Sequence, residues 1–287
     1  MTNKQKGILF ILISAFSFAL MNLFVQLAGD INPIQKSFFR NLISFLFAAS
    51  VLLKGKDFSF QKENLPFLIL RSALGTIGIL CNYYALSHLL LSDASMLNKL
   101  SPFFAIVFSM VVLNEIASKF EWFCVILAFS GALFVVKPTF SFEVIPALAG
   151  VIGGLGAGLA YTYVRKLGIR GEKSMIIVAF FSGFTTIALL PNLIMNYSPM
   201  SLEQWVFLAL TGFSAAGGQI CITNAYSKAP AKEISVYDFS IVIFTAILGF
   251  VFLDQIPDYL SVIGYVIIIG TAVIKWYVTV HKEASKA

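Results

Sequence analysis

LRSALGTIGILCNYYALSHLLLSDASMLNKLSP, residues 70–102, returns 140 positions later as LTGFSAAGGQICITNAYSKAPAKEISVYDFSIV, residues 210–242. The two copies keep one register without a gap, and the repeated stretch continues from residue 70 to Lys137. The identical positions include Leu70/Leu210, Gly78/Gly218, Cys81/Cys221, Ala85/Ala225, Ser87/Ser227, Ser95/Ser235 and Leu113/Leu253. A repeat of this length indicates that the chain consists of two homologous halves.

The composition excludes a soluble domain. The chain has 287 residues, of which 59% are hydrophobic and 12% are charged. An ordinary globular chain carries about 25% charged residues, so this chain has too little polar side-chain surface to cover a soluble body. The sequence therefore predicts an all-α integral membrane protein, in which internal repeats are typical of transporters with a site between the halves.

Ten apolar segments approach the length of about 20 residues that a membrane-spanning helix needs. The predicted helices are Gly7–Leu27, Ser37–Leu53, Leu65–Ser87, Ala94–Leu113, Phe120–Val136, Ile145–Val164, Ser174–Met195, Glu203–Ala225, Ile234–Leu253 and Tyr259–Val278. Five fall in residues 1–137 and five in residues 138–287, which we take as the two repeats. An odd number of helices per repeat makes the second half enter the membrane from the opposite side. We therefore expect two inverted five-helix repeats.

The distribution of Lys and Arg predicts the orientation in the membrane, because cytoplasmic loops carry the excess of basic residues. With the N-terminus inside, fifteen of the 20 basic residues are cytoplasmic, Lys36 and Lys137 are outside, and Arg40, Arg71 and Lys99 lie within segments or at their edges. The fifteen are Lys4, Lys6, Lys54, Lys56, Lys62, Lys119, Arg165, Lys166, Arg170, Lys173, Lys228, Lys232, Lys275, Lys282 and Lys286. Both termini are expected in the cytoplasm, and the localisation is expected to be the cell membrane.

Short motifs add a resemblance to a known family. They are Phe38-Phe39-Arg40 in the second segment, Arg71-Ser72-Ala73-Leu74-Gly75-Thr76 in the third, Leu113-Asn114-Glu115 after the fourth and Ser130-Gly131-Ala132-Leu133 in the fifth. With ten segments in two repeats, the chain resembles the EamA-type members of the drug/metabolite transporter superfamily. The resemblance implies the inverted-repeat fold. It is compatible with several functions, namely amino-acid and drug exporters, nucleotide-sugar-like carriers and adenosylmethionine-type importers.

Polar side chains follow single faces of several apolar segments, which is typical of helices that line water or contact other helices. The faces are Gly75, Gly78 and Asn82; Ser95, Asn98, Lys99 and Pro102; Gln219, Thr223 and Tyr226; and Ser235, Asp238, Thr245 and Gly249. Tyr161 lies near the face of Gly154 and Gly158. From these faces we predict a substrate site of Asn82, Ser95, Asn98, Lys99, Tyr161, Gln219, Thr223 and Asp238. Hydrogen bonding between helices is the alternative for about half of them.

Lys99 and Asp238 are the two deepest charges, and a charge within the membrane is costly unless it faces protein or water. Asp238 is expected to couple transport to protons or to bind a cationic substrate group, and Lys99 to bind an anionic one. The repeat pairs Asp238 with Asn98, so inverted helices place the two charges on opposite sides of a cavity rather than in contact. Static pairing, or Lys99 reaching the membrane surface, is the structural alternative.

Four further residues are expected to act in gating or structure. Arg40 and Arg71 are expected near the starts of their helices at opposite membrane surfaces, with their side chains extending to the membrane–water interface. Pro102 is expected to kink the fourth helix, and Glu115 to close it at the cytoplasmic surface. Close helix packing is expected along the glycines of the sixth segment, at Gly150, Gly154 and Gly158.

The function that this pattern predicts is secondary active transport of a small polar or amphipathic metabolite by alternating access, with proton or exchange coupling. The metabolite classes are amino-acid-like, nucleoside-derived and drug-like. We expect no enzymatic activity, cofactor or metal site. The expected partners are a small-molecule substrate, the lipid bilayer and a second copy in a homodimer, with no nucleic acid. A non-transporting membrane scaffold and a membrane-embedded enzyme are the alternatives.

Overall fold

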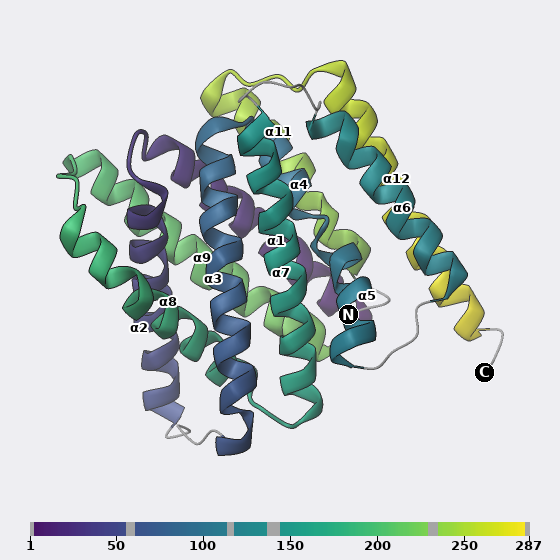
Figure 1. The fold of residues 1–287 in the computed structure, drawn as a ribbon, viewed down its shortest axis with the longest axis horizontal. Helices are drawn as coiled ribbons and strands as arrows, with labels where there is room; N and C mark the ends of the chain where they lie inside the picture. Colours follow the sequence, from purple (N-terminus) through teal and green to yellow (C-terminus); the bar gives the residue numbers. More distant parts are fainter. Residues whose placement is uncertain (1–2, 56–60, 114–117, 137–143, 229–234, 285–287) are drawn as a thin grey trace.

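The chain is described here by a computed structural model that covers residues 3–55, 61–113, 118–136, 144–228 and 235–284 (Figure 1). The regular structure in these ranges is helical. The α-helices are α1 (Asn3–Leu27), α2 (Pro33–Gly55), α3 (Leu65–His88), α4 (Leu91–Asn98), α5 (Ser101–Val112), α6 (Lys119–Val136), α7 (Ile145–Ile169), α8 (Ser174–Met195), α9 (Leu202–Lys228), α11 (Ser240–Leu253) and α12 (Tyr259–Ala284). Two 3₁₀ turns, η1 (Lys62–Asn64) and η3 (Ser235–Phe239), precede α3 and α11.

Within the described ranges, eight helical segments are long and apolar enough to cross a membrane, and η3 with α11 supplies a shorter one over Tyr237–Leu253. Two of the ten predicted spans are divided. The fourth consists of α4 and α5, and the ninth consists of η3 and α11. With α6, these segments make the ten-helix, inverted-repeat membrane fold that the sequence predicts.

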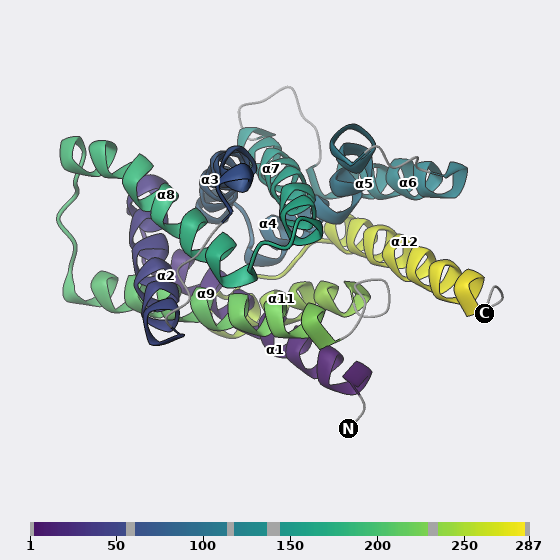
Figure 2. The same cartoon turned by 90° about the horizontal axis from the view of Figure 1, so that it is seen from below.

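The helix contacts repeat when the two halves are exchanged. α1 packs on α9 as α7 packs on α3, α2 packs on α9 as α8 packs on α3, and α1 packs on α11 as α7 packs on α5. The pairs α2–α8 and α6–α12 are their own counterparts, and Figures 1 and 2 show α6 beside α12 at one edge of the molecule. A pseudo-two-fold axis therefore runs between the halves.

Several helix boundaries differ from the predicted ones. α2 begins at Pro33 rather than Ser37, so Lys36 lies in the helix and not in an outside loop. Lys36 is 1% exposed, and its Nζ donates to the carbonyl oxygen of Val25 at 2.9 Å. α7 and α12 continue to Ile169 and Ala284. Both extensions contain charged residues. Each helix therefore continues into the membrane interface after its apolar span has ended.

The fourth span is interrupted where the sequence predicted a kink. α4 ends at Asn98, Lys99 and Leu100 form the junction, and α5 begins at Ser101 with Pro102 in its first turn. Proline has no N–H and clashes with the carbonyl four residues before it, here Asn98, but it suits the first turn of a new helix. Asp238 likewise lies in η3 rather than four residues into an α-helix. The fourth and ninth spans are thus both interrupted where the sequence predicted the interior of a helix, and the two interruptions lie at equivalent positions of the repeat.

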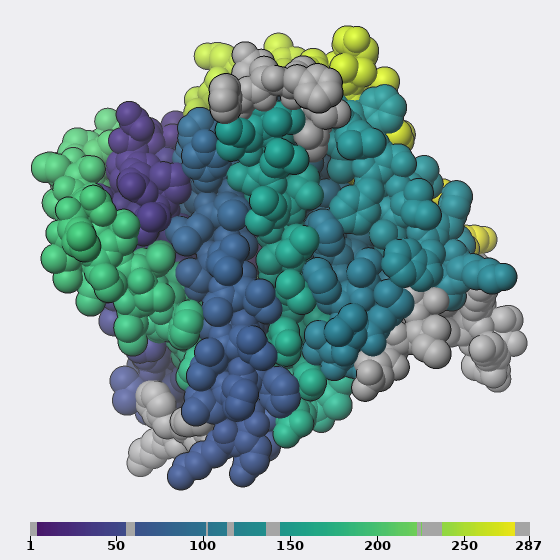
Figure 3. Space-filling view, viewed as in Figure 1, coloured from purple at the N-terminus to yellow at the C-terminus, as the bar shows by residue number. Residues whose placement is uncertain are grey.

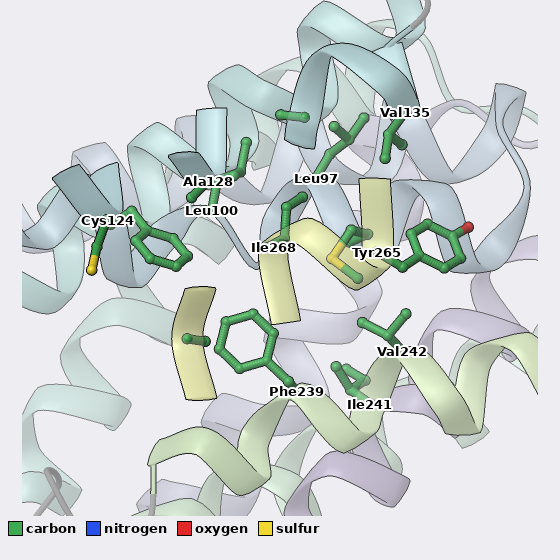
Figure 4. Packing of buried hydrophobic residues seen from close by; sticks show 14 of the residues in the cluster. Leu97, Leu100, Cys124, Ala128, Val135, Phe239, Ile241, Val242, Tyr265 and Ile268 are labelled. Carbon is green, nitrogen blue, oxygen red and sulfur yellow. The ribbon is translucent and has the colours of Figure 1, made fainter. Parts of the chain in front are cut away.

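An apolar cluster covers both interruptions. Leu97 and Leu100 of the fourth span and Phe239 and Val242 of the ninth pack with Ile268 of α12, as Figure 4 shows. The same cluster includes Ala128 of α6, so the α6–α12 pair is attached to the divided helices. This packing keeps the backbone at the interruptions buried in protein, which is where a membrane tolerates it.

Glycines on α7 permit close packing on two sides, as predicted for this segment. A Cβ added at Gly154 would lie 2.8 Å from the carbonyl oxygen of Leu97, at the end of α4. A Cβ added at Gly156 would lie 2.8 Å from Cα of Gly78 on α3. Figure 3 shows α3 and α7, in blue and teal, in contact along the face of the molecule. α7 therefore holds α3 on one side and the interrupted helix on the other.

We predict that Gly156→Ala lowers the unfolding temperature of the detergent-purified protein. The added methyl meets backbone rather than a movable side chain, and overpacking of this kind costs about 1–3 kcal/mol. Gly168→Ala in the same helix is the matched control, because its added Cβ has no atom within 4 Å. The control should gain about 0.5–1 kcal/mol from helix propensity. Equal unfolding temperatures for the two variants would contradict close packing at Gly156.

Candidate functional site

A cavity of about 130 Å³ lies between the two halves. α1, α2, α3, α4, α7, α8, α9 and α11 all contribute to its lining. Several lining residues are repeat counterparts, separated by 140 positions: Met21 and Tyr161, Ile79 and Gln219, and Asn82 and Ile222. The cavity therefore surrounds the pseudo-two-fold axis, where transporters with inverted repeats place their substrate site.

Most residues that the sequence predicted for the site meet in this cavity. Its polar and charged lining residues are Asn22, Arg40, Arg71, Asn82, Tyr83, Ser95, Asn98, Lys99, Tyr161 and Gln219. Six of these come from the predicted substrate site, and the two arginines come from the predicted gating set. Thr223 and Pro102 lie in α9 and α5, but their side chains are outside the described part of the chain. Glu115 also lies outside the described residues.

Lys99 and Asp238 contact each other, so the expectation that they face each other across a cavity is wrong. Lys99 Nζ donates to Asp238 Oδ2, and the two side chains are 12% and 15% exposed. The expectation assumed two continuous helices. Instead, both helices are interrupted at the centre of the bundle, and the long lysine side chain spans the remaining gap. Among the described residues, Oδ1 of Asp238 has no hydrogen-bond partner.

Arg40 and Arg71 are buried in the cavity rather than extended to the membrane surface, which corrects the second expectation. They are 7% and 6% exposed. Because α2 begins at Pro33, Arg40 lies about 10 Å into its helix at 1.5 Å per residue, and Arg71 lies about 9 Å into α3. Both guanidinium groups face the ring of Phe181 on α8, with Cζ 6.0 Å from its centroid for Arg40 and 3.7 Å for Arg71.

Amide and hydroxyl groups surround the charged residues. Asn22 Nδ2 donates to Ser95 Oγ at 3.1 Å, and Ser95 Oγ donates to the carbonyl oxygen of Leu91 at 2.7 Å. The Oδ1 atoms of Asn22 and Asn82 are buried, and neither has a hydrogen-bond partner among the described residues. The site predicted from the sequence did not include Asn22. The available signal was its position in a mostly apolar first segment, one helical turn before Gln26.

A second buried carboxylate was also missed. Asp93 is 6% exposed and accepts a hydrogen bond from the Tyr265 hydroxyl, whose oxygen also lies 2.9 Å from Ser92 Oγ. Asp93 lies in the first turn of α4 and contacts Tyr265 of α12. Its tyrosine partner gives it a structural role in attaching the two helices.

Hydrogen bonds between glutamines join the helix ends at one side of the cavity. Gln255 Nε2 donates to Gln26 Oε1 at 3.2 Å, while Gln255 Oε1 accepts from the Leu91 backbone N–H at 2.8 Å. Gln26 Nε2 donates in turn to the carbonyl oxygens of Leu86 and Leu89. These contacts tie the C-terminal ends of α1 and α3 to the start of α4 and the segment after α11.

Comparison with known proteins supports the two-repeat fold. The sequence pattern of the EamA-like transporter family matches residues 5–137 and again residues 144–276. A pseudopaline exporter, CntI, of Pseudomonas aeruginosa is 29% identical over 92% of this chain and 94% of its own length. Human solute carrier family 35 member G1 is 27% identical, covering 94% of this chain and 80% of its own. An uncharacterized transporter of Helicobacter pylori is 23% identical over 98% and 97%.

A solved crystal structure has the same fold. It superimposes with a TM-score of 0.67 at 13% identity and covers 93% of this chain and 95% of its own. At that identity the likeness concerns the fold alone. The two matches of the family pattern cover nearly all of both halves. This multi-pass membrane protein therefore belongs to the EamA-like transporter family.

Proposed function

We propose that this protein is a secondary active transporter of a small polar or amphipathic metabolite. The substrate binds in the cavity between the halves and crosses the cytoplasmic membrane by alternating access, coupled to protons or to exchange. The observation that carries this proposal is the cavity on the pseudo-two-fold axis, with polar side chains from both halves. Two relatives support it, since one is named an exporter and the other a solute carrier.

A membrane scaffold and a membrane enzyme each explain the residues that line the cavity less well than a transporter does. A membrane scaffold needs apolar packing between its helices and gains nothing from two buried arginines, which are costly inside a membrane. A membrane enzyme needs a nucleophile next to a base or a metal. The described lining supplies guanidinium, ammonium, amide and hydroxyl groups instead. Groups of this kind bind a polar solute without converting it.

The contact between Lys99 and Asp238 supplies a mechanism for coupling. Each residue belongs to a different half, so the ion pair can hold the halves in one arrangement. A proton on Asp238, or a charged substrate group competing for Lys99, removes the attraction between the two side chains. The halves are then free to move relative to one another. Because the repeat counterpart of Asp238 is Asn98, which cannot titrate, one half alone carries the proton.

We predict that Asp238→Asn abolishes accumulation driven by an imposed pH gradient, because an amide cannot take up and release the proton. Exchange of unlabelled for labelled substrate should continue. The measurement is uptake into proteoliposomes, after a counterflow screen of amino acids, nucleosides and organic acids has identified a substrate. Glu203→Gln, which changes an exposed carboxylate at the start of α9, is the matched control and should leave both activities unchanged.

The double variant Lys99→Gln with Asp238→Asn separates coupling from static pairing. Removing one partner of a buried ion pair costs about 3–5 kcal/mol, because the other charge is left uncompensated. The double variant should therefore fold better than either single variant but still lack pH-driven accumulation. Recovery of that accumulation in the double variant would mean that the pair is a static tie. Accumulation by Asp238→Asn alone would overturn the coupling role.

We also propose that both termini are cytoplasmic and that the two repeats meet between residues 137 and 138. The excess of Lys and Arg on one side supports this orientation. In this orientation, the connection before α9 is outside and the connection before α3 is inside. The finding that Lys36 lies in α2 leaves Lys137 as the one basic residue assigned to an outside connection.

We expect a membrane-impermeant maleimide to label Ser198→Cys in intact cells. Lys62→Cys should be labelled only after the cells are permeabilised. Both positions are exposed, and the background variant lacks Cys81, Cys124 and Cys221. The two sites serve as each other's controls, because they are predicted on opposite sides. Labelling of Lys62→Cys in intact cells, with Ser198→Cys protected, would reverse the orientation.

A further inference from the structure

The cavity carries an excess of positive charge. Arg40, Arg71 and Lys99 line it, and the described lining contains no carboxylate. Asp238 compensates Lys99 through their ion pair. Neither arginine has a carboxylate in ion-pair contact within the described residues. Two buried guanidinium charges therefore remain without a carboxylate partner among the described residues, and this is costly unless a ligand compensates them.

Both arginines have buried N–H groups left for a ligand. Nε and Nη1 of Arg71 and Nε of Arg40 are buried without a hydrogen-bond partner among the described residues. Arg40 Nη1 donates to Asn41 Oδ1 at 2.8 Å, which fixes the guanidinium and leaves Nε available. A guanidinium presents its N–H groups as a planar fork that matches the two oxygens of a carboxylate or phosphate.

Phe181 and Gly75 hold this arrangement in place. The Arg71 guanidinium lies over the Phe181 ring, and Gly75 provides the space for both. A Cβ at Gly75 would lie 2.9 Å from Cε2 of Phe181 and 3.3 Å from Nη1 of Arg71. The ring covers one face of the guanidinium but accepts none of its in-plane hydrogen bonds, so the edge of Arg71 is left to the cavity.

The repeat shows that the fold itself does not require these charges. The position equivalent to Arg40 is Phe180, and the position equivalent to Arg71 is Thr211. Thr211 is fully buried, and its hydroxyl donates to the backbone of its own helix at Phe207. The same structural location is therefore filled by a neutral side chain in the second half. The first half supplies both arginines, and their role is therefore to contact a molecule that enters the cavity.

We propose that Arg40 and Arg71 form an anion subsite that binds a carboxylate or phosphate group of the substrate. The transported metabolite is then a small organic anion, and its negative charge compensates the two guanidinium groups. This proposal rests on the proposed transport function, of which it names the substrate class. Phe181 contacts both arginines, so it positions the subsite, while Lys99, which also lines the cavity, faces the remainder of the substrate.

Thermal unfolding of the purified protein in detergent tests the subsite directly. The probes are succinate for a dicarboxylate and glycerol 3-phosphate for a phosphate monoester, with succinamide and glycerol as their uncharged analogues at matched ionic strength. At least one anion should raise the unfolding temperature, because a ligand that binds the folded state stabilises it. The uncharged analogues should not. No shift with either anion would overturn the proposal.

Substitution then assigns the effect to the two arginines. Arg40→Gln and Arg71→Gln should each weaken anion binding at least tenfold. Arg71→Lys, which keeps the charge but loses the fork, should fall between them and the unchanged protein. Lys54→Gln changes an exposed lysine at the end of α2 and should bind like the unchanged protein.

The unliganded variants exclude a folding artefact. Because each glutamine removes a buried charge that lacks a carboxylate partner among the described residues, the ligand-free Arg40→Gln and Arg71→Gln proteins should unfold at the same temperature as the parent or higher. Lower unfolding temperatures with the anion effect retained would make both arginines structural and overturn the subsite.

Transport separates the two proposals. Loss of anion binding in both variants, without transport of any compound by the parent protein, would support the subsite and contradict transport. Transport of an uncharged or cationic compound that both variants leave unchanged would support transport and overturn the subsite.

Discussion

The ion pair between Lys99 and Asp238 joins the halves at the two points where the membrane-spanning helices are interrupted. An interrupted helix leaves backbone N–H and C=O groups without partners, and a bilayer tolerates them only inside protein or beside a cavity. The surrounding structure meets that constraint. Gly154 lets α7 approach the last carbonyls of α4, and the cluster around Ile268 covers the other side. The cavity lies beside these two interrupted helices, which the ion pair connects.

The sequence predicted the fold well because a repeat and an apolar pattern are collective signals. It also predicted six of the ten polar and charged residues that line the cavity, since residues such as Asn82, Ser95 and Gln219 mark helix faces by spacing alone. The prediction failed where the position of a side chain depended on a single helix boundary or on a single break in a helix. Starting α2 at Ser37 left Arg40 near the surface, while the actual start at Pro33 buries it. Phe181 carried no signal, because 29 phenylalanines make any one of them unremarkable in the sequence.

The charges of the cavity work against the stability of the empty protein. A cation over an aromatic ring gains about 0.5–2 kcal/mol. An Arg at the centre of a membrane helix costs about 2.5–3.5 kcal/mol on insertion scales. The stacking of Arg71 on Phe181 therefore offsets only part of the cost of its burial, and Arg40 stands farther from the same ring. Such an imbalance is expected in a site built for a ligand, because full internal compensation would leave no free energy for binding.

The inverted repeat gives the two ends of the helix bundle different chemistry. Gln26 and Gln255 join helix ends through neutral amide hydrogen bonds. Their counterparts 140 positions away are Lys166 and Glu115, and Glu115 lies outside the described residues. Lys166 Nζ donates to the carbonyl oxygen of Val112, the last residue of α5. Neutral amide contacts change little with salt, whereas a charged lysine contact responds to ionic strength. One scaffold, used in two orientations, thus has a neutral glutamine contact at one end and a lysine at the equivalent position of the other.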